Sequence, residues 1–311
     1  MKIRLLQILR ILRILRILRL LIEKLVIPIL SLFHQLEFGR SLLYSAYPKN
    51  SAVLVTTTGG IKFIVNSSDN TIGRSVYIHR SAFDAEHVEQ ALQLLGIKEV
   101  NLLIDIGANI GTIGLYAVKE GLAKQCIAFE PEPKNFALLE MNICLNQMQE
   151  NFTCHNIALS DEEGAELEFE LSDENYGDHR VRKRKIDGLY KEEKREVIKV
   201  PSATLDSFLE SEKIENSLLF MDTQGFEGHI LQGAKSIIQK GVPIVTEYWP
   251  YGLKRAGGIE IFLTALENAP YTQIIDLRHP TKVLPFNRKT LTKIATELGD
   301  SGGFSDLLFK L

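Results

Sequence analysis

The chain has 311 residues, of which 45% are hydrophobic and 24% charged, and this composition is ordinary for a globular protein. The length allows one large α/β domain with attached segments. A net charge of only -3 gives no reason to expect nucleic acid as a partner. Cys126, Cys144 and Cys154 show neither CxxC spacing nor an even number, so neither disulfides nor zinc are expected and a reducing cytoplasm fits best.

The first 25 residues differ from the rest, because they repeat Ile-Leu-Arg and carry seven basic residues against one acid. A secretory signal would keep its charges ahead of an unbroken apolar run, and a membrane span would not carry four arginines through its middle. At about 100° per residue, one sector of a helix collects Ile8, Ile11, Ile14, Leu15, Leu18, Leu21, Ile22 and Leu25. The other side carries Arg10, Arg13, Arg16, Arg19 and Lys24.

This pattern predicts a basic amphipathic helix over residues 8–25 that lies in an anionic membrane surface, with the protein peripheral on the inner face of a membrane. Two alternatives stay open at this point: a helix packed on this domain or on a partner, and a low-complexity leader without a role. The stretch LVIPILSLFHQL that follows is interrupted by Pro28 and is too short to span a bilayer.

Residues 46–99 are interpreted as a β-rich lead-in. The run AVLVTTTGGIKFIV has two β-type segments around a Gly-Gly pair, which predicts a hairpin, and SVYIH predicts a further strand. The stretch FDAEHVEQALQLLG has helical spacing and ends on Gly96, a suitable C-cap. We therefore expect three parts: an N-terminal helical segment over 1–45, this lead-in and a main domain over 100–311.

From residue 100 onward, apolar strand-like runs alternate with helical stretches. Strands are predicted at NLLIDIG, QCIAFE, FTCHNIALS, AELEFELS, LLFMDT, PIVTEYW, YTQIIDLR and FSDLLFKL, and helices over residues 110–119, 133–146, 227–239 and 259–268. This alternation predicts a doubly wound, mostly parallel α/β sheet with helices on both faces. In such sheets, ligands bind beyond the carboxyl ends of the strands.

The segment NLLIDIGANIGTIGLYAV turns tightly between a strand and a helix. Asp105 ends the strand, Gly107 and Gly111 let the backbone come close to a ligand, and the helix N-terminus offers free N–H groups. A dinucleotide site would show G-x-G-x-x-G, whereas this turn has G-A-N-I-G. Glu130 closes the next strand, where an acid accepts hydrogen bonds from ribose hydroxyls in these sheets. The pattern predicts a site for a nucleoside without phosphate.

The chain resembles the FkbM-type S-adenosylmethionine-dependent methyltransferases over roughly residues 100–250. The resemblance rests on IDIGANIG, AFEPEPKNFALLEMNICLN, NIALSDEEG, the TLDSF segment and LLFMDTQGFEGHILQGA. It implies a Rossmann-like class I methyltransferase with a seven-stranded sheet and S-adenosylmethionine as donor. It also implies that the methionine part is bordered by Asp105, Gly107, Ala108, Asn109 and Gly111, the ribose by Glu130, and the adenine by Ser160 and Asp161.

Members of this family typically methylate hydroxyls of sugars, glycolipids or secondary metabolites, so the resemblance implies a small-molecule or glycan acceptor. Methyl transfer to a hydroxyl needs an oriented donor and a base that removes the proton. The candidate bases are His179, Asp178, Asp222, His229 and Glu247, of which His179 and Asp222 rank first. His179 lies in a polar loop, where a solvated histidine is the alternative, and Asp222 ends the fourth strand of the predicted sheet, where capping a turn is the alternative.

Other features bear on the acceptor. Many relatives have D-x-E-G where this chain has Asp222-Thr223-Gln224-Gly225, so no charge is available at Gln224. The sequence has no pair of adjacent aspartates and predicts no metal site, although Mg²⁺ held by Asp222 and nearby acids stays an alternative. Trp249 and Tyr251 either stack on a sugar ring or cover the end of the sheet.

Residues 179–199 mix both charge signs densely, which predicts a solvated insertion. Arg180, Arg182 and Arg184 of this segment would then be placed to steer an anionic acceptor. A scaffold protein that keeps the fold without turnover is the main alternative to an enzyme, and a nicotinamide-dependent oxidoreductase is a more distant one.

Overall fold

The computed structural model describes residues 13–184, 187–209, 214–299 and 302–311. Within this part of the chain, the largest sheet has the strand order β13-β12-β14-β11-β10-β3-β4-β5. Its strands are β3 (Val100–Ile106), β4 (Ala123–Phe129), β5 (Phe152–His155), β10 (Ser217–Met221), β11 (Ile244–Tyr248), β12 (Gln273–Asp276), β13 (Val283–Pro285) and β14 (Ser305–Lys310).

The sheet is doubly wound and mostly parallel, which confirms the predicted fold class. The strands β5, β4, β3, β10 and β11 run parallel to one another, and β14 lies antiparallel between β11 and β12. These seven strands form the expected sheet. The short edge strand β13 pairs antiparallel with β12 and adds an eighth strand that the sequence did not indicate, because it has only three residues and includes a proline.

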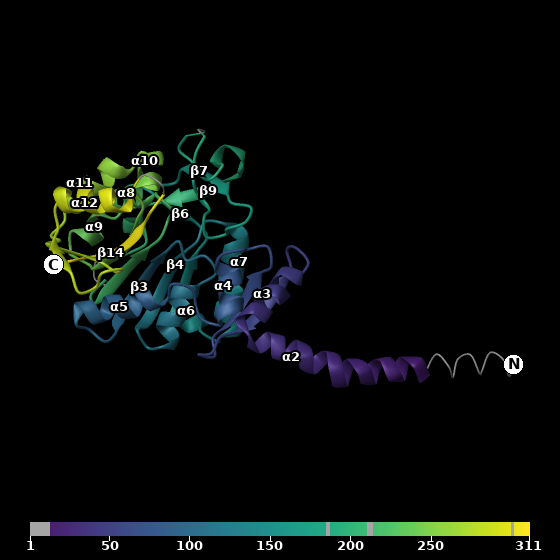
Figure 1. Cartoon of the computed structure of the whole chain (residues 1–311). Coiled ribbons are helices and arrows are strands. Elements are labelled where there is room, and N and C mark those ends of the chain that lie inside the picture. The colour runs from purple at the N-terminus through teal and green to yellow at the C-terminus, as the bar shows by residue number, and fades with distance from the viewer. Residues whose placement is uncertain (1–12, 185–186, 210–213, 300–301) are drawn as a thin grey trace.

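Two layers of helices enclose the sheet (Figure 1). One layer contains α5 (Glu86–Leu95), α6 (Thr112–Lys119) and α7 (Pro133–Leu145), and the other contains α8 (Glu227–Gln232), α9 (Lys235–Ile238), α11 (Ile259–Glu267) and α12 (Arg288–Leu298). Side chains alternate along β3, so Leu103 joins the apolar cluster beneath the first layer while Ile104 joins the cluster beneath the second. Because both faces are covered, β10 and β11 are buried along their whole length.

The predicted strand FTCHNIALS is in fact two strands in different sheets. The chain leaves the main sheet after β5, where the Asn156 amide donates to the carbonyl oxygens of Glu130 (2.8 Å) and Pro131 (3.1 Å) and turns the backbone. A second sheet with the strand order β6-β9-β7-β8 follows. Its strands are β6 (Ala158–Leu159), β7 (Glu166–Leu171), β8 (Arg180–Val181) and β9 (Glu196–Ala203).

Two other element predictions are wrong and two are confirmed. The stretch SVYIH belongs to a helix, α4 (Ile72–His79), whose Val76 packs into the core and overrides the β propensity of the segment. The predicted helix over 227–239 is interrupted at Gly233, where a Cβ would lie 2.0 Å from the Ser160 carbonyl oxygen. The hairpin forms as β1 (Ala52–Thr56) and β2 (Lys62–Asn66), and α5 ends at Gly96 with a positive φ of 71°.

The predicted solvated insertion is only partly right for its described residues. Lys183, Arg184 and residues 187–191 are exposed, but a network of buried ion pairs also lies there. Arg180 contacts Asp178 at 2.5 Å and Glu192 at 3.5 Å, and Arg182 contacts Glu170 at 2.9 Å. The side chains of Arg180 and Glu192 are 4% and 0% exposed. The mixed charges pair within the second sheet, so Arg180 and Arg182 are not available to steer an anionic acceptor.

The N-terminal helix projects away from the body (Figure 1). The predicted helix over 8–25 lies partly outside the described residues; residues 13–21 are helical, and the chain continues through a π-helical turn, η1 (Ile22–Val26), into α2 (Ile27–Gln35) and α3 (Glu37–Ala46). Among the described residues, no helix is both long and apolar enough to cross a membrane.

Candidate functional site

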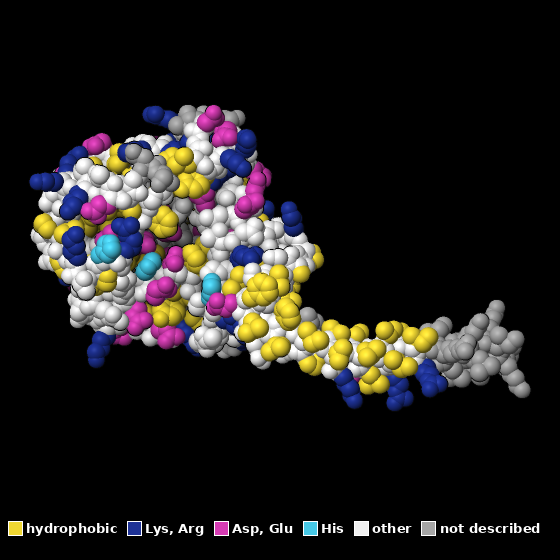
Figure 2. Space-filling model, viewed as in Figure 1, with side chains coloured by type: hydrophobic (Ala, Val, Ile, Leu, Met, Phe, Trp, Pro, Cys, Tyr) yellow, Lys and Arg dark blue, Asp and Glu magenta, His cyan; other side chains and the backbone are white. Residues whose placement is uncertain are grey.

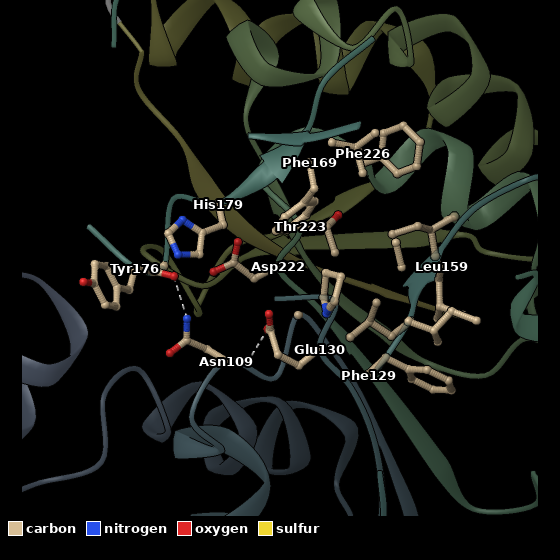
Figure 3. A pocket seen from close by; sticks show the side chains of 18 of the residues that line it. Asn109, Phe129, Glu130, Leu159, Phe169, Tyr176, His179, Asp222, Thr223 and Phe226 are labelled. Carbon is tan, nitrogen blue, oxygen red and sulfur yellow. Dashed lines mark hydrogen bonds between the residues drawn. The ribbon is translucent and has the colours of Figure 1, made fainter. Parts of the chain in front are cut away.

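A pocket opens where the central parallel strands end, as the predicted fold requires. It has an empty volume of about 620 Å³, part of which is open to solvent. Figure 3 shows the pocket with a polar half and an apolar half. The polar half contains Asn109, Glu130, His179 and Asp222, and the apolar half contains Phe129, Ile157, Leu159, Phe226 and Ile230.

Gly107 and Gly111 shape the turn between β3 and α6. Gly107 has a φ of 85°, and a Cβ there would lie 2.0 Å from the Asp222 carbonyl oxygen, so only glycine lets the turn pass this closely to the end of β10. Gly111 has a φ of 87°, and a Cβ there would lie 2.7 Å from a methyl group of Leu139. Gly107 lines the pocket, whereas Gly111 serves the packing of α6 against α7.

Asn109 connects the β3–α6 turn to two other parts of the pocket wall, Glu130 and the loop around Tyr176. Its backbone N–H donates to Glu130 Oε2 at 2.9 Å, and its side-chain Nδ2 donates to the Tyr176 carbonyl oxygen at 2.9 Å (Figure 3). Its own backbone has a φ of 50°, in the left-handed region that asparagine tolerates better than most residues. The turn is therefore fixed by hydrogen bonds before any ligand arrives.

Glu130 is held rigidly at the end of β4. Its Oε2 accepts the Asn109 N–H, and its Oε1 accepts the Glu132 N–H at 2.8 Å. Burial raises the pKa of Glu130 to about 8, against the lowering effect of these two backbone hydrogen bonds. Each carboxylate oxygen keeps a free lone pair, so the side chain can still accept hydrogen bonds from a ribose diol.

The loop around Tyr176 was missed by the sequence analysis, although it forms one wall of the pocket. The Tyr176 carbonyl oxygen accepts from Asn109 and from Asn135 Nδ2 (3.1 Å), and its N–H donates to Asp69 at 3.3 Å. Asp69 comes from the lead-in and is 2% exposed. Asn135 of the EPEPKN segment was the sequence signal for this wall, because Asp69, which also holds Tyr176, is distant from it in the chain.

Several predicted donor residues do not line the pocket. Asp105 is 1% exposed and points to the opposite face of β3, where it accepts the Gly114 N–H and where burial raises its pKa to about 7. Ala108 is buried behind the turn, and its N–H donates to the Phe129 carbonyl oxygen. For Asp105, this position indicates a role in holding α6 rather than contact with a ligand.

Ser160 and Asp161, the residues expected near the adenine, also lie beyond the pocket, which is instead lined by the residues just before them. The Asp161 carboxylate lies 3.3 Å from His229 Nδ1, and His229 Nε2 lies 3.2 Å from the Ala256 carbonyl oxygen. His229 is therefore engaged in packing α8, and it lies behind the lining, with its ring stacked on that of Phe226 at 4.5 Å between centroids.

A second cavity adjoins the first and shares Ile72, Gly177 and Asp222 with it. It has an empty volume of about 1,140 Å³ and lies beyond the ends of β10 and β11. Acidic and aromatic side chains contribute much of its wall: Asp84, Glu174, Asp178, Glu247, Phe83, Tyr190, Trp249 and Phe304. Asp222 is thus the acidic side chain that faces both spaces.

Asp222 and Glu247 form a pair of acids bridged by an amide. Gln224 Nε2 donates to Asp222 Oδ1 at 2.7 Å and lies 3.4 Å from Glu247 Oε2. Asp222 is open to the cavities, but the protein that surrounds it limits its hydration and, with the nearby Asp306 carboxylate, raises its pKa to about 8. Burial and the Asp222 charge raise the pKa of Glu247 well above its usual range. Both acids therefore hold their protons to a higher pH than usual, and Asp222 takes up and releases one near pH 8.

His179 and Asp178 are poorly suited to act as bases. His179 Nδ1 accepts the Ser172 N–H at 2.9 Å, so the neutral ring carries its proton on Nε2, and burial lowers the pKa of His179 to about 4. The Asp178 carboxylate oxygens accept hydrogen bonds from Arg180 and Arg195. Asp222 is the predicted base that the geometry favours.

The aromatic pair behind the second cavity is largely engaged within the protein. Trp249 is 4% exposed, its Nε1 donates to the Gly302 carbonyl oxygen at 3.0 Å, and the Arg180 guanidinium lies 4.8 Å from its ring centre. Tyr251, in α10 (Pro250–Arg255), donates its hydroxyl to Glu192 at 2.8 Å and does not line the cavity. Trp249 therefore offers the cavity an edge rather than a free face for stacking.

The fold and the pocket together define a Rossmann-like protein with a nucleoside-type site at the ends of its parallel strands. The chain belongs to the FkbM methyltransferase domain family, whose model matches residues 105–271. Members of this family use S-adenosylmethionine as methyl donor. The residues present fit it, because the pocket joins an apolar half suited to adenine to a strand-end carboxylate suited to ribose.

Solved structures show more distant likeness. The methyltransferase FkbM from Methylobacillus flagellatus KT is 16% identical and aligns over 78% of this chain and 55% of that chain, with a TM-score of 0.43. TYW2 from P. horikoshii in complex with MeSAdo is 15% identical over 85% of this chain and 71% of that chain, with a TM-score of 0.41. The tRNA m1G37 methyltransferase of M. jannaschii is 11% identical over 86% of this chain and 58% of that chain, with a TM-score of 0.43. No curated protein matches the chain.

Proposed function

We propose that this protein transfers the methyl group of S-adenosylmethionine to a hydroxyl oxygen of a sugar, a glycolipid or a related metabolite. The observation that carries the proposal is the position of Asp222, whose carboxylate faces both the nucleoside-type pocket and the larger acid-lined cavity. A base at this boundary can reach a hydroxyl in one space while the donor occupies the other.

In this proposal, the first pocket holds the donor. Glu130 would accept hydrogen bonds from the ribose hydroxyls, and the apolar half with Phe129 and Leu159 would hold the adenine. Gly107 and Asn109 would border the methionine part. Bound S-adenosylmethionine supplies an electrophilic methyl group, and the residues of the chain supply position and a proton acceptor.

The proton of the acceptor hydroxyl would pass to Asp222. A base works best when its pKa lies near the working pH, and Asp222 meets this condition because its pKa is raised to about 8. Gln224 orients its Oδ1 through the 2.7 Å hydrogen bond, which leaves Oδ2 for the acceptor. Glu247, whose pKa is raised by burial and by the Asp222 charge, would form a hydrogen bond to a second hydroxyl of the same substrate.

The walls of the second cavity support a neutral polyhydroxylated acceptor. Asp84, Asp222 and Glu247 line it together with the basic side chains of Lys191 and Arg195. Arg180, Arg182 and Arg195 are paired with acids, whereas Arg184 is exposed. Carboxyl groups accept hydrogen bonds from sugar hydroxyls, so this lining suits a polyhydroxylated acceptor. The free thiols of Cys126, Cys144 and Cys154 support a cytoplasmic site of action.

Titration with S-adenosylhomocysteine tests the donor pocket. We expect micromolar binding by calorimetry, with a strong loss in Glu130→Gln and little change in Glu163→Gln, which alters an exposed glutamate. Methyl transfer would then be measured with labelled S-adenosylmethionine and a panel of sugars and glycolipids. Binding without transfer to any acceptor would support the scaffold alternative. If neither S-adenosylhomocysteine nor S-adenosylmethionine bound, the proposal would be refuted.

A further inference from the structure

The N-terminal helix exposes more apolar surface than any other described element. Every described side chain over residues 13–26 is exposed. Ile14, Leu18, Leu21 and Leu25 are 56%, 48%, 53% and 61% exposed. Soluble proteins rarely show a contiguous apolar surface of this extent unless it binds something.

The apolar surface continues onto the body. Figure 2 shows apolar side chains along the projecting helix and over the part of the body that it joins. On α3, Phe38 is 72% and Leu42 is 49% exposed. The helix α3 is fixed to the body, because the buried Tyr44 hydroxyl lies 2.7 Å from the Asn66 carbonyl oxygen and 2.8 Å from that of Asp69. Phe38 and Leu42 are therefore part of the surface of the folded domain.

The charge of the helix is opposite to that of the body. Residues 1–25 carry a surplus of six positive charges, and because the whole chain carries -3, the remaining residues carry -9. Among the described helical residues, Arg13, Arg16 and Arg19 lie on the side away from Leu18. An anionic lipid surface offers both an apolar layer for the apolar side chains of this helix and negative charges for its arginines.

The shape of the apolar sector argues against pairing with a second copy. Leu18, Leu21 and Leu25 have the spacing of a coiled-coil seam, but the flanking positions Leu15 and Ile22 are apolar instead of charged. With Ile17 and Val26, which are also exposed, the apolar sector spans about 180° around the helix, wider than a two-stranded seam, and Leu20 lies among the arginines. A wide apolar sector with arginines on the opposite side is typical of helices that lie in a bilayer interface.

From this arrangement we infer that residues 13–42 form a docking surface for anionic membranes, in which the helix lies in the interface and the exposed side chains of α3 contact the same bilayer. The helix supplies affinity through its apolar sector and its arginines. Phe38 and Leu42 supply orientation, because they belong to the folded body. Binding should weaken with salt, since much of the attraction is electrostatic.

Sedimentation of the full chain with vesicles tests the inference. The vesicles would contain phosphatidylcholine alone or with about one third phosphatidylglycerol. We expect binding to the anionic vesicles, reduced about tenfold or more by Leu18→Glu with Leu21→Glu, and similarly at low salt by Arg13→Gln, Arg16→Gln and Arg19→Gln. The control Val283→Glu places the same charge on an exposed apolar side chain of β13 and should leave binding unchanged.

Docking of the body is tested with Phe38→Trp and brominated lipids. The native Trp249 is buried, so its emission should not be quenched, whereas the variant should show quenching by anionic brominated vesicles. S-adenosylhomocysteine affinity, measured in parallel, should be equal in all variants and keeps this test separate from the proposed methyl transfer. Equal binding to neutral and anionic vesicles, no binding, or a dimer by light scattering that Leu18→Glu with Leu21→Glu dissociates would overturn the inference.

Discussion

Glu130 follows β4 and Asp222 follows β10 in the same sheet. The pKa of each is raised to about 8, yet their surroundings differ. Both oxygens of Glu130 accept backbone N–H groups, so its position is fixed by the main chain. Asp222 accepts one hydrogen bond, from the side chain of Gln224, and borders two cavities. Equal pKa values therefore do not imply equal roles.

In the proposed function, this difference assigns Glu130 to binding the donor and Asp222 to accepting the proton. A carboxylate fixed by two main-chain hydrogen bonds is a preorganised acceptor for hydroxyl groups, and protonation would disrupt that arrangement. A carboxylate that accepts only one side-chain hydrogen bond can change its protonation state with little rearrangement. The four predictions below test this division between donor pocket and acceptor cavity.

The largest effect is expected at Asp222. The change Asp222→Asn keeps the size of the side chain and removes its ability to accept a proton, so kcat should fall about 10²–10⁴-fold. Affinity for S-adenosylhomocysteine, measured by calorimetry, should change less than about threefold, because Glu130 and the apolar half of the pocket are untouched. Retention of more than about a tenth of the activity would move the base to another residue.

The converse effect is expected at Glu130. The change Glu130→Gln replaces one carboxyl oxygen, which accepts hydrogen bonds, by an NH₂ group that only donates, so affinity for S-adenosylhomocysteine should fall about 10–100-fold. With saturating donor, kcat should be reduced much less than in Asp222→Asn. If the two variants instead lost affinity and kcat in the same proportion, the assignment of separate roles to the two cavities would be wrong.

Activity should depend on pH through Asp222. Because its pKa is raised to about 8, the base is mostly protonated at pH 7 and mostly ionised at pH 9. With both substrates saturating, kcat should therefore rise about tenfold between these values and then level off. The residual activity of Asp222→Asn should lack this rise. A falling profile over the same range would contradict a carboxylate base.

The sequence predicted the local parts of the site well. Gly107 and Glu130 lie where the strand, turn and acid pattern indicated, because the end of a parallel strand and the turn after it are set by neighbouring residues. Asp105 shows the limit of that reasoning. Its position at the end of β3 was predicted. Because side chains along a strand alternate between the two faces of the sheet, a shift of one residue decides whether this side chain faces the pocket or α6.

The non-local parts could not be predicted. The wall around Tyr176 depends on Asp69, more than 100 positions away in the chain, and the second cavity combines Asp84 with Glu247 and Phe304. The charged run over 179–199 suggested solvent exposure, because its acidic partner Glu170 lies on a different strand of the second sheet. Such contacts become visible only when the fold brings distant segments together.

The smallest expected effect concerns the turn itself. Asn109→Gly keeps a residue that adopts the left-handed backbone and removes the hydrogen bond from Nδ2 to the Tyr176 carbonyl oxygen. That oxygen still accepts from Asn135, so the wall should remain and affinity for S-adenosylhomocysteine should fall only about threefold. Asn109→Gly combined with Asn135→Ala leaves the buried carbonyl without a donor and should lose more affinity than the two single changes added together. Simple additivity in calorimetry would mean that the two asparagines act independently, and that the wall of the donor pocket is held by the lead-in alone.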